Sequence, residues 1–164
     1  MIILLFDLDQ TIYNTRPKMN YDDVKYDKLL HELIKSDHPS FILTNATYDH
    51  ADIVLKNLKI SEEFQKIYSR DTMMFMKPHK HCYTMVQNDI EIEYPIDYFI
   101  SWHDYYFFDD LLENLEEAKK NGWYTIWIHP ECNDVHNKDK HSYVDYAYPN
   151  LKIALYKMRL KNIL

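Results

Sequence analysis

The sequence predicts an α/β fold, a doubly wound three-layer sandwich with a mostly parallel central sheet. Short apolar runs alternate along the chain with segments of helical periodicity, and the connections between them are short. The residues with the most informative chemistry are Asp7, Thr44, Lys77 and Asp109, which are 37, 33 and 32 positions apart. That interval is about one strand–helix unit, so each residue is expected at the end of a successive strand. Residues 1–164 are therefore expected to form a single domain.

The first half of the chain is expected to contain three strands and three helices. Met1–Phe6 reads MIILLF, a continuous apolar run that is typical of a central parallel strand buried on both faces. The other two strands are expected at Ser40–Leu43 and Lys66–Ser69. The helices are expected at Asp22–Lys35, Asp49–Leu58 and His79–Gln87, the last with Pro78 in its first turn.

The second half is expected to continue the alternation. The strands are expected at Tyr105–Phe108 and Thr125–Ile128, and the helices at Leu111–Asn121 and from Leu151 onwards. Gly122 follows the first of these helices, where a left-handed cap residue is expected, and Asn150 is expected to cap the second. Tyr98–Ser101 is consistent with a strand or with irregular structure, and His129–Ser142 is expected to be a polar loop.

Composition and charge exclude several classes of function. A net charge of −7 argues against a general nucleic-acid-binding surface, because neutralising phosphates needs clustered Lys and Arg. The sequence has no long apolar run, and Met1–Phe6 resembles neither a signal peptide nor a membrane span. We therefore expect a cytoplasmic protein without a membrane partner, in which Cys82 and Cys132 are reduced thiols. The single glycine, Gly122, excludes phosphate loops built from glycine-rich turns.

Two aspartates follow the first expected strand. Asp7, at the end of a buried strand, is placed to attack a phosphate group as a nucleophile. Asp9 lies two residues further on and is placed to lean over the same phosphate. There it would protonate the leaving oxygen and then deprotonate the water that hydrolyses the aspartyl-phosphate. By itself, the pair is equally consistent with a polar turn after a strand.

Thr44, Asn45 and Lys77 offer the contacts that a phosphate group needs. The Thr44 hydroxyl and the Asn45 amide are expected to bind phosphate oxygens, although Thr-Asn is also common turn chemistry. The Lys77 ammonium is expected to contact substrate, to stabilise the transferred charge and to keep Asp7 ionised. These three residues complete a catalytic and substrate-binding set around Asp7.

A second acidic pair, Asp109 and Asp110, follows the aromatic run YYFF. Paired carboxylates at the end of a buried strand repel each other unless a cation relieves them, and oxygen ligands of this kind suit Mg²⁺. We expect Asp109 to bind Mg²⁺ together with Asp7 and the backbone carbonyl of Asp9. Asp110 is expected to lie behind these ligands.

The ordered set of motifs resembles the haloacid dehalogenase (HAD) superfamily of phosphohydrolases, whose first motif has the form DxDxT. The matching residues are Asp7, Asp9 and Thr11 in the first motif, Thr44 in the second, Lys77 in the third, and Asp109 and Asp110 in the fourth. The resemblance extends from Ile3 to about Leu155. It implies a HAD-like, Rossmann-like fold, Mg²⁺ as the cofactor, and Thr11 among the substrate-binding residues.

Within the superfamily, four stretches look most like the pyrimidine 5′-nucleotidase-like branch. They are FDLDQTIYNT, TNAT followed by His50, KPH and FFDDLLEN. Members of that branch insert a helical cap between the first and second motifs, whereas only Ile12–Leu43 separates these motifs here. The resemblance therefore implies no substantial cap domain, and it leaves open whether Ile12–Leu43 forms a miniature cap. An open site implies large substrates or closure by a partner chain.

The sequence thus predicts a Mg²⁺-dependent phosphatase that hydrolyses phosphomonoesters, of a nucleotide or a phosphorylated macromolecule, through an aspartyl-phosphate on Asp7. A phosphotransferase and a catalytically weak binding or scaffolding protein are the alternatives. A receiver-type signalling domain uses similar groups, but its acidic pair comes first and its phospho-accepting aspartate later, the reverse of the order here. The oligomeric state is left open.

Overall fold

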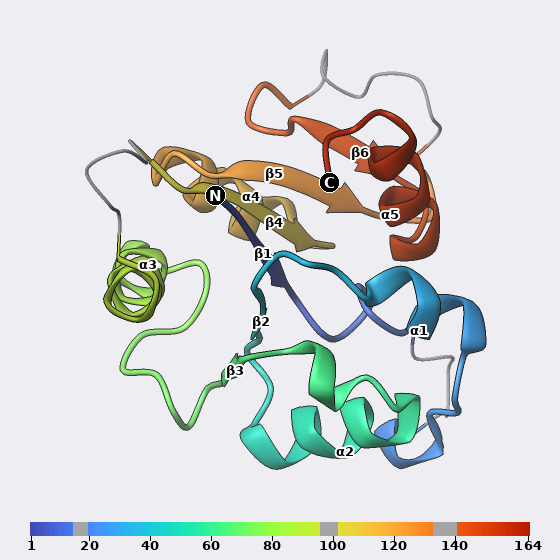
Figure 1. Cartoon of the computed structure of the whole chain (residues 1–164). Helices are drawn as coiled ribbons and strands as arrows, with labels where there is room; N and C mark the ends of the chain where they lie inside the picture. Colours follow the sequence, from blue (N-terminus) through green and yellow to red (C-terminus); the bar gives the residue numbers. More distant parts are fainter. Residues whose placement is uncertain (15–19, 96–101, 133–140) are drawn as a thin grey trace.

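The computed structural model describes residues 1–14, 20–95, 102–132 and 141–164. Within them, six strands form one sheet in the order β3-β2-β1-β4-β5-β6, and every neighbouring pair is parallel (Figure 1). The strands are β1 (Ile2–Phe6), β2 (Ser40–Leu43), β3 (Lys66–Tyr68), β4 (Asp104–Asp109), β5 (Tyr124–Ile128) and β6 (Tyr146–Tyr148). The predicted doubly wound parallel fold is confirmed.

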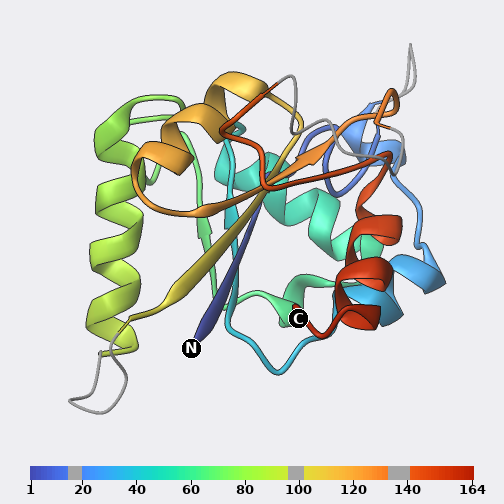
Figure 2. The same cartoon turned by 90° about the horizontal axis from the view of Figure 1, so that it is seen from above.

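Helices cover both faces of the sheet, which gives three layers (Figure 2). The helices on one face are α1 (Lys28–Ile34), α2 (Tyr48–Leu58) and α5 (Leu151–Leu160), and those on the other are α3 (Lys80–Glu93) and α4 (Leu112–Lys120). Side chains alternate along β1, so Leu4 and Phe6 enter the core on the first face, and Ile3 and Leu5 enter the core on the second. β1 is therefore buried on both faces, as its continuous apolar run predicted.

The predicted helix at Asp22–Lys35 is wrong in extent. A short 3-10 helix, η1 (Tyr21–Asp23), comes first, and the chain is extended at Val24 before α1 begins at Lys28. Asp27 ends the extended segment because its Oδ1 accepts the amide of Leu30 at 3.0 Å, an N-cap bond that an aspartate inside a helix could not make. The apolar periodicity across this region therefore spans two elements.

The predicted helix at His79–Gln87 is too short. α3 continues to Glu93 because Val86 and Ile90, four residues apart, both pack into the core on the second face. His79 is the N-cap residue, so Pro78 precedes the helix and does not lie in its first turn. Tyr98–Ser101 and most of the predicted loop at 129–142 lie outside the described residues.

Several smaller predictions are confirmed. Gly122 follows α4 with a left-handed φ of 87°, and Asn150 caps α5 by accepting the amide of Ile153 at 3.0 Å. Cys82 and Cys132 are buried and form no disulfide with each other.

Within the residues that the structure describes, we find no helix with the length and apolarity needed to cross a membrane.

The connection between β1 and β2 supplies a helix of the sandwich. Its described residues contain η1 and α1, and Leu30 and Ile34 of α1 lie in the core on the first face. η1 lies against α2, where Nδ2 of Asn57 donates to the carbonyl oxygen of Asp22 at 3.2 Å. The small size of the sandwich is in keeping with the absence of a large cap domain from the described residues.

The sheet has one switch point, between β1 and β4. From β1 the chain moves outward through β2 to β3, and it then returns to the other side of β1 as β4 before it continues outward to β6. In such sheets, ligands bind outside the carboxyl ends of the strands at the point where the order reverses. The fold therefore predicts a ligand-binding site near the residues that follow β1 and β4.

Candidate active site

Three of the predicted site residues lie at the carboxyl ends of neighbouring strands. Asp7 directly follows β1, Thr44 directly follows β2, and Asp109 is the last residue of β4. Because β1 lies between β2 and β4, the three side chains reach the same end of the sheet, at its switch point. The structure thus brings together residues that are far apart in the sequence.

Lys77 does not lie at a strand end, contrary to the expectation from its spacing. β3 ends at Tyr68, and Lys77 lies in the loop that leads to α3. Asn45 holds this loop, because its Nδ2 donates to the carbonyl oxygen of Lys77 at 2.9 Å and its Oδ1 accepts the amide of Lys77 at 3.1 Å. Both ends of the Asn45 amide therefore position Lys77.

The Lys77 ammonium is buried between two aspartates. Its Nζ donates to Oδ1 of Asp7 and to Oδ2 of Asp109, each at 2.7 Å. The side chains of Lys77 and Asp109 are 1% and 0% exposed, and that of Asp7 is 10% exposed. Burial by itself would lower the pKa of Lys77, but the charges of Asp109 and Asp7 outweigh it and hold that pKa above its ordinary value. The ammonium is therefore a permanent positive charge beside Asp7.

Asp109 has hydrogen-bond donors on both carboxylate oxygens. Its Oδ1 accepts the amide of Leu111 at 2.8 Å, and Nδ2 of Asn114 lies 3.1 Å from Oδ1 and 3.0 Å from Oδ2. Asn114 is buried at the start of α4, and sequence reasoning gave it no role. Its place at the end of the motif FFDDLLEN was the available signal. These bonds hold the Asp109 carboxylate toward Asp7.

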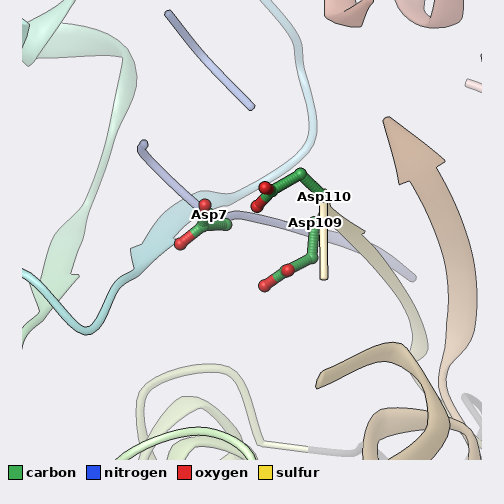
Figure 3. Close-up of side chains that lie close together, drawn as sticks. All are labelled: Asp7, Asp109 and Asp110. Carbon is green, nitrogen blue, oxygen red and sulfur yellow. The ribbon is translucent and has the colours of Figure 1, made fainter. Parts of the chain in front are cut away.

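Asp7, Asp109 and Asp110 form an acidic cluster. One carboxylate oxygen of each lies within 4.8 Å of the other two, and Figure 3 shows Asp109 and Asp110 turned toward Asp7. Burial raises the pKa of Asp7 to about 7, and burial together with the charge of Asp109 raises the pKa of Asp110 to about 6. A divalent cation would relieve this repulsion, and carboxylate oxygens are the ligands that Mg²⁺ prefers. The donor set therefore fits Mg²⁺.

The candidate site opens into a cavity of about 450 Å³. Of the predicted residues, Asp7, Asp9, Thr44, Asn45, Lys77 and Asp110 line it. Oγ1 of Thr44 accepts the amide of Ala46 at 3.0 Å, a bond that does not use the hydroxyl proton. That proton is available to a ligand oxygen in the cavity.

Thr11 does not line this cavity. The chain turns back after Asp9, because Gln10 adopts a left-handed conformation with a φ of 64° and the amide of Ile12 donates to the carbonyl oxygen of Leu8 at 2.9 Å. Thr11 is buried, its Oγ1 has no hydrogen-bond partner among the described residues, and it lines a second cavity of about 490 Å³. A contact between its hydroxyl and a substrate stays a prediction.

The Asp9 carboxylate lies outside the acidic cluster and is held by two residues that sequence reasoning did not place in the site. The Tyr13 hydroxyl donates to Oδ1 of Asp9 at 2.5 Å, and Nε2 of His50 lies 3.1 Å from the same oxygen. Burial and the bond to Asp9 raise the pKa of Tyr13 above its ordinary value, so its hydroxyl remains a donor. Metal binding through the backbone carbonyl of Asp9 stays a prediction.

Arg70 is a further cavity residue that sequence reasoning missed. It comes shortly after β3, and its amide donates to the carbonyl oxygen of Ala46 at 3.0 Å. Its side chain is exposed, lines the cavity and forms no ion pair with the residues that the structure describes. Nothing in the sequence distinguishes it from a solvated surface arginine.

The sequence matches a known protein family. The sequence profile of the haloacid dehalogenase-like hydrolase family matches residues 19–128, which include Thr44, Lys77 and Asp109. No curated protein sequence matches the chain.

Solved structures share the fold at low sequence identity. L-2-haloacid dehalogenase from Xanthobacter autotrophicus is 14% identical with a TM-score of 0.61, over 85% of this chain and 63% of the dehalogenase. The HAD-hydrolase YfnB from Bacillus subtilis, in a structure bound to magnesium, is 16% identical with a TM-score of 0.60, over 79% of this chain and 52% of YfnB. An uncharacterized protein from Listeria monocytogenes serotype 4b is 19% identical with a TM-score of 0.64, over 100% of both chains.

At these identities, the structural similarity establishes the fold alone. The chain also spans less than two thirds of the length of the dehalogenase and of YfnB. The pyrimidine 5′-nucleotidase-like branch stays a prediction. The family profile, however, covers more than half of the sequence, and the solved structures share its fold. The chain therefore belongs to the haloacid dehalogenase-like hydrolase family.

Proposed function

We propose that the protein is a Mg²⁺-dependent phosphatase that hydrolyses phosphomonoesters through an aspartyl-phosphate on Asp7. The observation that supports this most strongly is the buried contact of Lys77 with Asp7 and Asp109, next to a third carboxylate, Asp110. A carboxylate attacks an anionic phosphate only where cations offset the repulsion between them. Mg²⁺, held by the cluster of Asp7, Asp109 and Asp110 and by the backbone carbonyl of Asp9, would add the positive charge that Lys77 does not supply.

The first half of the reaction transfers the phosphoryl group to the protein. A carboxylate oxygen of Asp7 forms a bond to phosphorus while the bond between phosphorus and the ester oxygen breaks. Lys77 orients Asp7 and stabilises the charge on the transferred group, and the Thr44 hydroxyl donates to a phosphate oxygen. Asp9 gives a proton to the departing ester oxygen, which leaves as an alcohol.

The second half returns the protein to its starting state. Asp9, now ionised, takes a proton from a water molecule as the water oxygen attacks phosphorus. The bond between phosphorus and Asp7 breaks, and inorganic phosphate leaves. A phosphotransferase would differ only in the acceptor, because an alcohol would take the place of water.

Attack on a carbon that carries a halogen is the competing reaction, because dehalogenases share the fold. That reaction releases a halide ion and gives no physical reason to gather three carboxylates within 4.8 Å of one another. A phosphoryl-transfer site that binds Mg²⁺ does give such a reason. YfnB, a protein of the same fold, is bound to magnesium in its structure, which supports the choice of Mg²⁺.

As substrate we propose a nucleotide or a phosphorylated macromolecule. The cavity of about 450 Å³ accommodates a phosphoryl group and part of its ester, and the exposed Arg70 at the cavity offers a cation to a further anionic group. Among the described residues, the segments between β1 and β2 and between β3 and β4 add no separate domain over the cavity. A large phosphate ester would therefore reach Asp7 without displacing a cap.

The proposal is tested by measuring phosphate release with and without Mg²⁺. The panel contains p-nitrophenyl phosphate, nucleoside monophosphates, 5′- and 3′-phosphorylated oligonucleotides and a phosphopeptide. Asp7→Asn serves as the blank. Asp52→Asn is the matched control, because Asp52 makes an ion pair with the exposed Lys56 on α2 and does not line the cavity. Glycerol added as an acceptor detects phosphotransfer, and chloride release from 2-chloropropionate detects dehalogenation.

We expect phosphate release that needs Mg²⁺, survives Asp52→Asn and disappears in Asp7→Asn. Chloride release without phosphate release would replace the proposal with dehalogenation. Tight binding of an ester without product would favour the binding or scaffolding protein.

A further inference from the structure

A side-chain network beside the cavity connects Asp9 to α2. The Tyr13 hydroxyl lies 2.5 Å from Oδ1 of Asp9, and Nε2 of His50 lies 3.1 Å from Oδ1 and 2.9 Å from the Tyr13 hydroxyl oxygen. The Tyr13 hydroxyl donates its proton to Asp9, so its oxygen accepts from Nε2 of His50, which also lies within ion-pair distance of Oδ1 of Asp9. Tyr13 and His50 therefore both approach the same oxygen of Asp9.

Tyr13 and His50 lie in segments whose backbone is fixed by hydrogen bonds. Tyr13 returns over Asp9 because the turn after β1 is closed by bonds from the amides of Ile12 and Tyr13 to the carbonyl oxygen of Leu8, at 2.9 and 3.4 Å. His50 lies in the first turn of α2, where Oγ1 of the N-cap residue Thr47 accepts its amide at 3.3 Å. The network thus joins the first motif to the helix that follows the second.

The imidazole of His50 is also held from its other side. The ring of Tyr21 stacks on it, with the ring centroids 4.2 Å apart and an angle of 19° between the planes. Tyr21 belongs to η1, which Asn57 anchors to α2 through the carbonyl oxygen of Asp22 at 3.2 Å. The His50 side chain is only 22% exposed as a result. Its orientation toward Asp9 is therefore restrained by packing as well as by hydrogen bonds.

We propose that Tyr13 and His50 are positioning residues that hold Oδ1 of Asp9 so that Oδ2 exchanges the proton with the reacting oxygen. This inference rests on the proposed function. Oδ1 accepts the Tyr13 hydroxyl and lies within ion-pair distance of His50, whereas Oδ2 accepts no bond from the described residues, and Asp9 lines the cavity. In the forward step the proton leaves Oδ2 for the ester oxygen as the bond between phosphorus and that oxygen breaks and the bond from phosphorus to Asp7 forms.

The chain offers matched controls for this network, away from the cavity. A tyrosine–aspartate bond that only supports the fold occurs elsewhere in the chain, where the Tyr68 hydroxyl donates to Oδ2 of Asp89 at 2.6 Å. Tyr68 lies on β3 and Asp89 on α3, and neither residue lines the cavity of the candidate site. Tyr68→Phe is therefore the matched control for Tyr13→Phe. His31→Ala is the control for His50→Ala, because the His31 side chain is 21% exposed and lies on α1.

The test compares two esters of similar shape, p-nitrophenyl phosphate and phenyl phosphate, at one pH with saturating Mg²⁺. p-Nitrophenolate leaves without a proton, whereas phenolate leaves far more readily when an acid protonates it. The value of kcat/KM reports the step in which the ester bond breaks. In Tyr13→Phe and His50→Ala we expect kcat/KM to fall about tenfold or more further for phenyl phosphate than for p-nitrophenyl phosphate. His50→Gln, which retains a donor at the same reach, should recover part of the loss.

Two further results decide the interpretation. In an Asp9→Asn background, which has already lost the proton transfer, His50→Ala should cause no additional loss for phenyl phosphate. Equal losses for the two esters, or losses that multiply in the Asp9→Asn background, would show that the network only supports the fold. Melting temperatures of all variants identify any that fail to fold, and His50→Gln then serves in their place. No phosphate release from the wild-type protein would overturn the proposed function and this inference with it.

Discussion

Replacement of Lys77 by methionine removes the only positive charge that forms ion pairs with both Asp7 and Asp109 among the described residues. The ammonium donates to each carboxylate at 2.7 Å, and the side chains of Lys77 and Asp109 are almost completely buried. Methionine keeps much of the volume of lysine but donates no hydrogen bond. The variant would leave two buried carboxylates close together without a counter-ion.

The expected cost follows from the burial of the pair. Removing one partner of a buried ion pair costs about 3–5 kcal/mol, since the remaining charge stays desolvated. In the Mg²⁺-free protein at pH 8, we therefore expect Lys77→Met to lower the free energy of unfolding by about this amount. With a urea m-value of about 2 kcal/mol/M, the midpoint of unfolding would fall by about 2 M.

Urea unfolding in EDTA measures this loss, and Lys66→Met is the matched control. Lys66 also contacts an aspartate, Asp89, at 2.6 Å, but the two side chains are 47% and 44% exposed. An exposed pair contributes about 0–1 kcal/mol, so its replacement should shift the midpoint by less than about 0.5 M. Equal shifts for the two variants would refute the view that a buried, charge-bearing centre is built around Lys77.

Three further predictions concern the metal, the substrate and Asn114. Burial raises the pKa of Asp7 to about 7 and the pKa of Asp110 to about 6. The metal-free folded protein therefore retains protons that the unfolded chain releases above pH 4. As a result, the stability of the metal-free protein falls as the pH rises toward 7. Mg²⁺ needs ionised carboxylates, so the increase in Tm on adding Mg²⁺ should be larger at pH 8 than at pH 5. Differential scanning fluorimetry measures this increase. An equal increase at the two pH values would contradict the assigned cluster. Arg70→Ala should raise KM about tenfold for phosphate esters that carry a second anionic group, and less for p-nitrophenyl phosphate, in steady-state assays. Asn114→Ala removes the amide that contacts both oxygens of Asp109. It should therefore lower the free energy of unfolding by about 1–3 kcal/mol and weaken Mg²⁺ binding in calorimetric titration. Unchanged values would mean that water replaces the amide.

The sequence was sufficient for the sheet and for the residues that directly follow its strands. Continuous apolar runs mark strands buried on both faces, and Asp7, Thr44 and Asp109 end or follow such runs. In a parallel sheet these positions must meet at one edge, so their proximity followed from the pattern alone. Lys77 was harder, because it lies in a loop and is held by Asn45 through backbone contacts that leave no periodic signal.

The rest of the site depends on contacts between separate segments. Tyr13 and His50 meet at Asp9 because a turn after β1 and the first turn of α2 lie side by side, which no local pattern encodes. The same turn places Thr11 at another cavity, although Thr11 belongs to the same sequence motif, DxDxT, as Asp7 and Asp9. Arg70 looks like a solvated arginine in the sequence and reaches the cavity only through the position of β3.

The central claim is that Asp7 carries the phosphoryl group, and trapping that intermediate tests it most directly. The protein would react with its preferred phosphate ester and Mg²⁺, be quenched in acid, and be treated with borohydride, which reduces an aspartyl-phosphate to homoserine. Peptide mass spectrometry should then find homoserine at position 7, in an amount that increases in Asp9→Asn because hydrolysis of the intermediate is slowed. Rapid phosphate release with an unmodified Asp7, or with the modification at another residue, would contradict the account.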